Sequence, residues 1–178
     1  MPHPSRPLAS FLLLLATALA AGCSLLPAKP AAPAPVAAVP TAAMVAAIRA
    51  AGVREKSVID VTPLRDPAVT DLRVAARHDE LAGQYAAAAH TLDQALKLAP
   101  DSPDLLQDRA EIAVRLQDFG DAEKLAHRSW SLGPKLGPLC ARNWQTIVEV
   151  RLQQRDKAGA ASAQRWVREC HKPGIQRF

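Results

Sequence analysis

The chain has 178 residues, and removal of residues 1–22 would leave 156, enough for one domain with its own core. Aromatic residues make up only 4% of the chain. This scarcity argues against a large β-sandwich or barrel, whose sheets need aromatic and β-branched side chains. The charge is unevenly divided: residues 71–124 carry 6 basic and 11 acidic side chains, whereas residues 128–178 carry 10 basic and 3 acidic ones.

Residues 1–22 predict an export signal. Arg6 gives a positive start, and Leu8–Ala21 is an uncharged run of 14 residues, too short for a membrane-spanning helix of about 20 residues. The run leads through small residues to Cys23. This pattern resembles the lipobox of bacterial lipoproteins, although Ala20 stands where the family usually has Leu, Val or Ile. An ordinary cleaved signal followed by an unrelated cysteine is the alternative.

The lipobox resemblance implies cleavage before Cys23, acylation of that residue and therefore a permanent membrane tether. Ser24 after the cysteine implies the outer membrane, by similarity to Gram-negative lipoproteins, with the domain facing the periplasm. Residues 23–40 form a Pro/Ala-rich linker, expected to be extended polyproline that reaches about 50 Å. An exported protein without aromatic stacking platforms is not expected to bind nucleic acid.

Residues 41–66 follow the linker. We expect a short helix over Thr41–Ala51, ended by Gly52, that packs as a cap or is loosely attached. Residues 53–65 read as irregular or extended.

The next segment contains a repeat of 34 residues. Four pairs of residues have this separation: Ala76 and Ala110, Tyr85 and Phe119, Ala88 and Ala122, and Pro100 and Pro134. The pattern resembles the tetratricopeptide repeat (TPR), a helix–turn–helix of this length, and it predicts an all-α solenoid of helical hairpins. Small alanines would let the helices approach closely, and the prolines would stop each second helix.

Helix starts and a third repeat follow from the same logic. Asp66-Pro67 and Ser102-Pro103 each offer a capping side chain followed by proline. Arg115-Leu116-Gln117 recurs as Arg151-Leu152-Gln153 at a spacing of 36, which places Ala158 at the position of Ala122. The predicted repeat domain is therefore 67–171, with units at about 67–100, 101–136 and 137–171 and a tail at 172–178.

Two cysteines remain beside Cys23. Cys140 and Cys170 lie at similar distances from the third predicted turn, so the hairpin would place them side by side and favour a disulfide in an oxidising compartment. The rival interpretation is a thiol hydrolase that uses one of these cysteines with His171 as base.

Motifs for catalysis and for metal binding are missing from the sequence. His78, His90 and His127 are scattered, and neither an HExxH motif, a Walker loop, a dinucleotide fingerprint nor a GxSxG elbow occurs. We expect no enzyme activity, no cofactor, no metal and no small-molecule substrate.

The repeat predicts a groove lined by the first helix of each hairpin, where TPR proteins take a segment of a partner. Faces of the three first helices give nine candidate groove residues: Arg73, Arg77, Glu80, Gln107, Glu111, Val114, Asn143, Ile147 and Val150. The predicted function is a membrane-anchored adaptor for envelope proteins, in cell-wall enzyme regulation or secretin and pilus assembly, as the resemblance implies. The alternative is a non-catalytic structural protein whose basic C-terminal half contacts cell wall or lipid.

Overall fold

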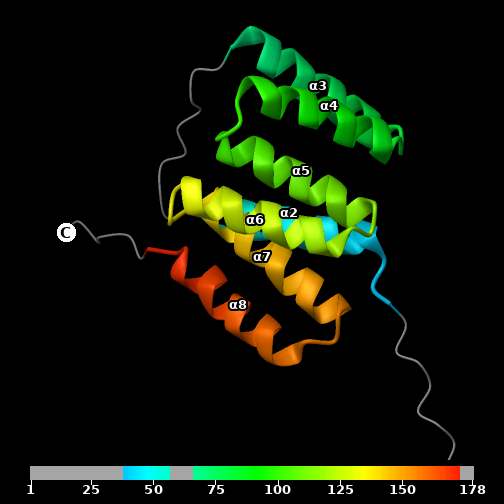
Figure 1. Cartoon of the computed structure of the whole chain (residues 1–178). Helices are drawn as coiled ribbons and strands as arrows, with labels where there is room; N and C mark the ends of the chain where they lie inside the picture. The colour runs from blue at the N-terminus through cyan, green and yellow to red at the C-terminus, as the bar shows by residue number, and fades with distance from the viewer. Residues whose placement is uncertain (1–37, 57–65, 173–178) are drawn as a thin grey trace, which may run out of the picture. The chain divides into compact units, whose positions relative to one another are not determined.

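The computed structural model describes residues 38–56 and 66–172 of the chain. The predicted signal, Cys23 and most of the linker lie outside these residues, as do 57–65 and 173–178. The described residues form seven helices and no strand (Figure 1), which confirms the all-α prediction. The helices are α2 (Thr41–Arg54), α3 (Pro67–Leu81), α4 (Tyr85–Leu98), α5 (Pro103–Arg115), α6 (Phe119–Leu132), α7 (Pro138–Gln153) and α8 (Lys157–Glu169).

Six of the helices pair as three hairpins, α3–α4, α5–α6 and α7–α8, which is the predicted repeat arrangement. Each turn contains one residue with a left-handed backbone: Gly83 (φ 75°), Gln117 (φ 63°) and Arg155 (φ 65°). The amide that follows this residue donates to a carbonyl of the last helical turn in all three hairpins, over 2.8–2.9 Å. The turns are therefore built alike, although only the first uses glycine.

The first helix of each hairpin begins with proline, at Pro67, Pro103 and Pro138. Asp66 caps α3 as expected, because its carboxylate accepts a hydrogen bond from the amide of Ala68 at 2.8 Å. Ser102 does not cap α5 through its side chain. Its hydroxyl instead donates to Asp104 at 2.7 Å.

Small buried residues allow the close packing of the hairpins. Ala76, Ala88, Ala110 and Ala122 are all buried, as the repeat predicts. Ser129 is also fully buried, and its hydroxyl donates to the carbonyl of Pro103 at 2.6 Å. A polar residue is thus accommodated at a position where the family prefers alanine, because its hydrogen bond is made within the core.

The register of the third hairpin differs from the sequence prediction. The turn residues Gln117 and Arg155 are 38 positions apart, not 36, because α7 is longer than α5. The buried alanine of α8 is accordingly Ala160, whereas Ala158 is exposed. The 36-residue spacing was wrong for this helix because it came from matching Arg115-Leu116-Gln117 to Arg151-Leu152-Gln153, whereas the ends of α5 and α7 are 38 positions apart.

Helix α2 does not belong to a hairpin. It packs on α7 and α5, although α7 lies about 90 residues further along the chain (Figure 1). It also extends to Arg54, past Gly52, where the sequence predicted its end. We call the surface formed by the inner faces of α3, α5 and α7 the groove, and α2 covers part of it.

Candidate functional site

The nine candidate groove residues fall into two groups. Six of them are fully buried: Gln107, Glu111, Val114, Asn143, Ile147 and Val150. All six lie on α5 and α7, the two helices against which α2 mainly packs. On α3, Glu80 is buried as well, whereas Arg73 and Arg77 remain partly exposed. The structure therefore divides the groove into a covered part on α5 and α7 and an open part next to α3.

The covered part is filled by one face of α2. Met44, Val45 and Ile48 are buried in one cluster with Val114 and Val150. These α2 residues follow the spacing of a single helix face.

The end of α2 fits closely against the start of α7. A Cβ atom added to Gly52 would lie 2.8 Å from Cγ of Arg142 and 3.2 Å from the carbonyl oxygen of Pro138. Glycine is therefore required for α2 to come this near to α7.

A network of charges joins α2 to the groove. Arg49 donates from Nε to Glu111 at 2.7 Å and from Nη2 to Glu80 at 2.8 Å. Arg142 reaches the other oxygen of Glu111 at 2.6 Å. Glu111 is fully buried, so its two arginine partners supply the compensation that a buried carboxylate needs.

Burial and ion pairing oppose each other in this network. Burial alone would raise the pKa of Glu80, but hydrogen bonds and charges from Arg49 and Arg77 outweigh it and hold the pKa below its ordinary value. Burial alone would lower the pKa of Arg142, yet Glu111 and Asp108 raise it. Ion pairing therefore outweighs burial for Glu80 and for Arg142 and favours the charged form of each.

The open part of the groove is a cleft of about 750 Å³. Its apolar lining includes Val53 of α2, Val74 and Ala76 of α3, and Ile112 of α5. Val74 is 65% exposed, although it stands on the inner helix of its hairpin. Further lining residues carry guanidinium or carboxylate groups: Arg49, Arg73, Arg77, Glu80, Asp108 and Arg142. A cleft with an apolar floor and polar groups at fixed positions is suited to binding rather than to chemistry.

Ion pairs fix the arginines of the cleft. Arg73 donates to Asp108 at 2.6 Å and to Asp104 at 3.0 Å. Asp108 also accepts from Arg142 at 2.9 Å, so it links α3 to α7 across α5. The guanidinium groups are thereby held in defined positions along the cleft.

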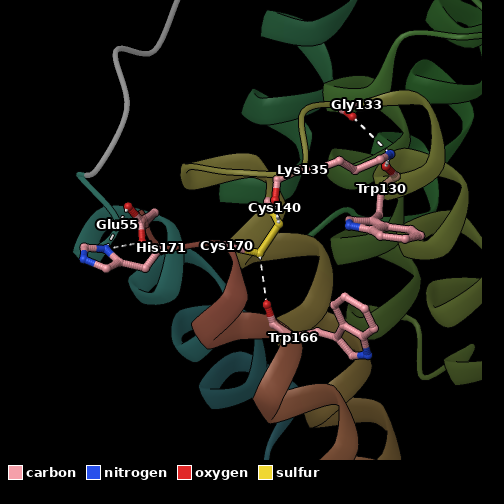
Figure 2. Close-up of a disulfide and its surroundings, with 8 residues drawn as sticks. All are labelled: Glu55, Trp130, Gly133, Lys135, Cys140, Trp166, Cys170 and His171. Atoms are coloured by element: carbon pink, nitrogen blue, oxygen red, sulfur yellow. Dashed lines mark hydrogen bonds and ion pairs between the residues drawn. A yellow bond between two sulfur atoms is a disulfide. The ribbon is translucent and has the colours of Figure 1, made fainter. Parts of the chain in front are cut away.

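The structure joins Cys140 and Cys170 in a disulfide with a Cα–Cα distance of 5.6 Å (Figure 2). Neither sulfur is then a free thiolate, which the hydrolase interpretation requires. The His171 ring contacts Glu55 at the end of α2, with Nδ1 3.1 Å from a carboxylate oxygen. His171 thus ties α2 to the end of α8 and does not face a nucleophile.

The tryptophans of the chain gather beside this disulfide. Trp144 and Trp166 are stacked with ring centroids 5.2 Å apart, and Trp130 packs edge-on against Trp144 at 5.3 Å. The Lys135 ammonium lies 4.5 Å from the Trp130 ring centroid. Trp166 covers Trp144, as expected of a residue at the end of the repeat array, and remains 46% exposed itself.

Within residues 38–56 and 66–172, no group of three His, Cys, Asp or Glu side chains is arranged to hold a metal ion. None of the helices in these ranges has the length and apolar character needed to cross a bilayer.

The position of α2 is the main feature that sequence reasoning missed. Met44, Val45 and Ile48 mark an apolar face, and this signal was readable in the sequence. The sequence does not indicate which helices this apolar face packs against, because α5 and α7 lie far from α2 along the chain. A single Arg49 on that face, opposite Glu111, was the available clue to the pairing.

Comparisons with known proteins agree with this architecture. Residues 81–135 match the family model described as tetratricopeptide repeat. The solved structure of the globular C-terminal domain of P. aeruginosa LpoP is similar at 30% sequence identity and a TM-score of 0.56, over 59% of this chain and 99% of that one. No curated protein sequence gives a match. Neither finding indicates an enzyme family, and both indicate a protein-interaction scaffold. With its three hairpins, its 34-residue period and this relative, the chain belongs to the tetratricopeptide repeat family.

Proposed function

We propose that this protein is an adaptor, anchored by lipid at Cys23 to the outer membrane, that binds an envelope protein on its periplasmic side. The lipobox-like sequence supports the anchor, and the Pro/Ala-rich linker would hold the domain away from the bilayer. The partner would be a cell-wall enzyme or a component of a secretin or pilus assembly. Similarity to the LpoP domain supports an interaction role in the envelope.

The observation that carries the proposal is the open cleft beside α3. Single exposed apolar side chains are common on protein surfaces, but Val53 and Val74 line one concave cleft together and are 73% and 65% exposed. Arg73 and Arg77 stand beside them and are the two predicted groove residues that α2 leaves partly exposed. Apolar surface next to arginine is the composition of an interaction hot spot.

Photo-crosslinking in cells tests the contact. A photoreactive amino acid at position 74 should capture the partner, which mass spectrometry then identifies. Val74→Glu should reduce co-purification of that partner at least tenfold, because it places a charge on the apolar floor. Leu81→Glu is the matched control, since Leu81 is an equally exposed apolar residue of α3 that does not line the cleft.

The anchor requires a separate test. Intact mass of protein extracted from membranes should correspond to a chain that begins at an acylated Cys23. Cys23→Ser protein should leave the membrane fraction. An unmodified chain mass, or retention of the serine variant on membranes, would contradict this part of the proposal.

The structural-protein alternative predicts a different pattern. Binding to purified cell wall would then depend on salt and on the basic side chains of residues 128–178, and Val74→Glu would have no effect. Sedimentation with purified cell wall at low and high salt separates the two functions.

A further inference from the structure

Helix α2 occupies the covered groove without being part of the repeat. Among the described residues it has no hairpin partner. Its outer positions, such as Ala46, are exposed, whereas Met44, Val45 and Ile48 are buried. An amphipathic helix laid by one face into a groove is the geometry of a bound peptide segment.

Two amides on the inner faces of α5 and α7 lack hydrogen-bond partners. Asn143 is fully buried, and neither atom of its amide has a partner among the described residues. Oε1 of Gln107 is likewise unpartnered. Buried amides without partners are costly, so a side chain that reached them would add to the stability of the filled groove.

The groove also sets a charge requirement for whatever fills it. Glu80 and Glu111 both accept hydrogen bonds from Arg49. Nη2 of Arg49 reaches both oxygens of Glu80, at 2.8 and 2.9 Å, while its Nε reaches Glu111. A planar guanidinium can serve two carboxylates in this way, whereas a lysine ammonium offers a single point of contact.

We propose that the covered groove is a receptor for an amphipathic helix, and that α2 is an internal ligand which a partner helix bearing an arginine at the place of Arg49 displaces. This inference rests on the proposed function, because it specifies the segment that the envelope partner offers. The partner helix has apolar residues at the positions of Met44, Val45 and Ile48, and a small residue at that of Gly52. A polar side chain that reaches Asn143 would give it an advantage over α2.

Peptide binding to the whole mature chain tests the proposal. The probe is a fluorescent synthetic peptide of residues 38–56, and the measurement is anisotropy. Ile48→Asp in the chain should expel α2, because it would bury an unpaired carboxylate. The Ile48→Asp chain should bind the peptide at least tenfold more tightly than wild type. Ala46→Asp, on the exposed face of the same helix, is the matched control and should bind like wild type.

Variants of the peptide test the charge requirement. Arg49→Glu in the peptide should abolish binding to the Ile48→Asp chain, and Arg49→Lys should weaken it at least fivefold. Equal binding of all three peptides would overturn the arginine requirement.

Further outcomes decide whether α2 is a ligand or core. If the Ile48→Asp chain loses its helical circular-dichroism signal, the Gly52→Leu chain is used in its place. Gly52→Leu alters only the contact between the last turn of α2 and α7. Equal peptide binding by Gly52→Leu and wild type would overturn the proposal. A wild-type dimer in light scattering that Ile48→Asp converts to monomer would also overturn it, since α2 of a second copy would then be the occupant.

The test is independent of the proposed function. Peptide binding is measured on the purified chain and needs no envelope partner, whereas capture of the partner is tested through Val74 of α3.

Discussion

The first and third hairpins have the same architecture but opposite surroundings. In α3, the inner face borders an open cleft, and Val74 is largely exposed there. In α7, the corresponding face is closed by α2, and Ile147 and Val150 have no exposed surface. The repeat therefore determines the backbone of each hairpin. Whether the inner face of a hairpin is open or covered depends on other parts of the chain.

The same contrast holds inside the two hairpins. The first is packed mainly with small residues, among them Ala76, Ala88 and Ala89. The third adds Trp144, Ile147 and a disulfide to its core. Larger buried side chains remove more apolar area from water, so stabilisation is concentrated at the C-terminal end. The less stabilised first hairpin is the one that borders the open cleft, which agrees with the general finding that binding regions are drawn from less stable parts of a fold.

Removal of the disulfide should reduce the difference in stability between the first and third hairpins more than any other change. We expect Cys140→Ser combined with Cys170→Ser to lower the free energy of unfolding by about 3–4 kcal/mol, the chain-entropy value for a loop closed over 30 residues. Urea unfolding of the variant and the oxidised wild type measures the difference. A loss below about 1 kcal/mol would mean that the third hairpin is held by packing alone.

A cavity in the core of the third hairpin should have the second-largest effect on the free energy of unfolding. Ile147→Ala removes a fully buried side chain and should cost about 2–4 kcal/mol in unfolding free energy. Leu81→Ala in the first hairpin truncates a side chain that is 74% exposed and should change stability by less than about 0.5 kcal/mol. Equal losses from the two variants in chemical denaturation would show that Ile147 is not a buried core residue.

Low pH should weaken the ion-pair contact between α2 and the first hairpin. The pKa of Glu80 lies below its ordinary value of 4.5 because Arg49 and Arg77 outweigh the effect of burial. A lowered carboxyl pKa gives stability that is present above 4.5 and lost as pH falls through the folded-state value. We expect the wild-type Tm to fall below pH 4.5 more steeply than that of Glu80→Gln, which should already be a few degrees lower at pH 7. Parallel pH profiles of Tm would contradict this.

The smallest effect is expected at Glu149 of α7. Burial raises the pKa of Glu149, and a hydrogen bond from Gln145 at 2.7 Å offsets this only in part. The raised pKa means that the ionised carboxylate costs stability above the folded-state value and nothing below 4.5. Glu149→Gln should therefore stabilise the protein slightly at pH 7, within about 0.5 kcal/mol, and not at pH 4. Thermal unfolding at the two pH values provides the check.

Local sequence signals predicted the hairpins because each signal acts within a few residues. Asp66 caps the helix that it precedes, and the buried Ala76 and Ala110 mark the contacts between neighbouring helices. The match of Ala158 to Ala122 in the third hairpin was wrong by two residues, because the second helices of the last two hairpins are related by 38 positions and the buried alanine is Ala160.

The candidate site was less accessible to such reasoning. Helix faces correctly grouped Glu111, Asn143 and Ile147 on inner surfaces, but periodicity cannot tell solvent from a helix that docks from elsewhere. Glu111 is completely buried between Arg49 and Arg142. We therefore expect Glu111→Arg to prevent folding, because it would bury a third guanidinium in place of the carboxylate that both arginines share.

The turns of the hairpins have a consequence for how freely this protein can change. Gln117 and Arg155 adopt a backbone conformation that costs a residue with a side chain about 1 kcal/mol, and glycine adopts it without that cost. Glycine at either position should therefore give added tolerance to mutation. Libraries that alter the groove would retain more folded members in that background, and the same two positions offer natural lineages a route by which new partner specificity could be acquired without loss of the fold.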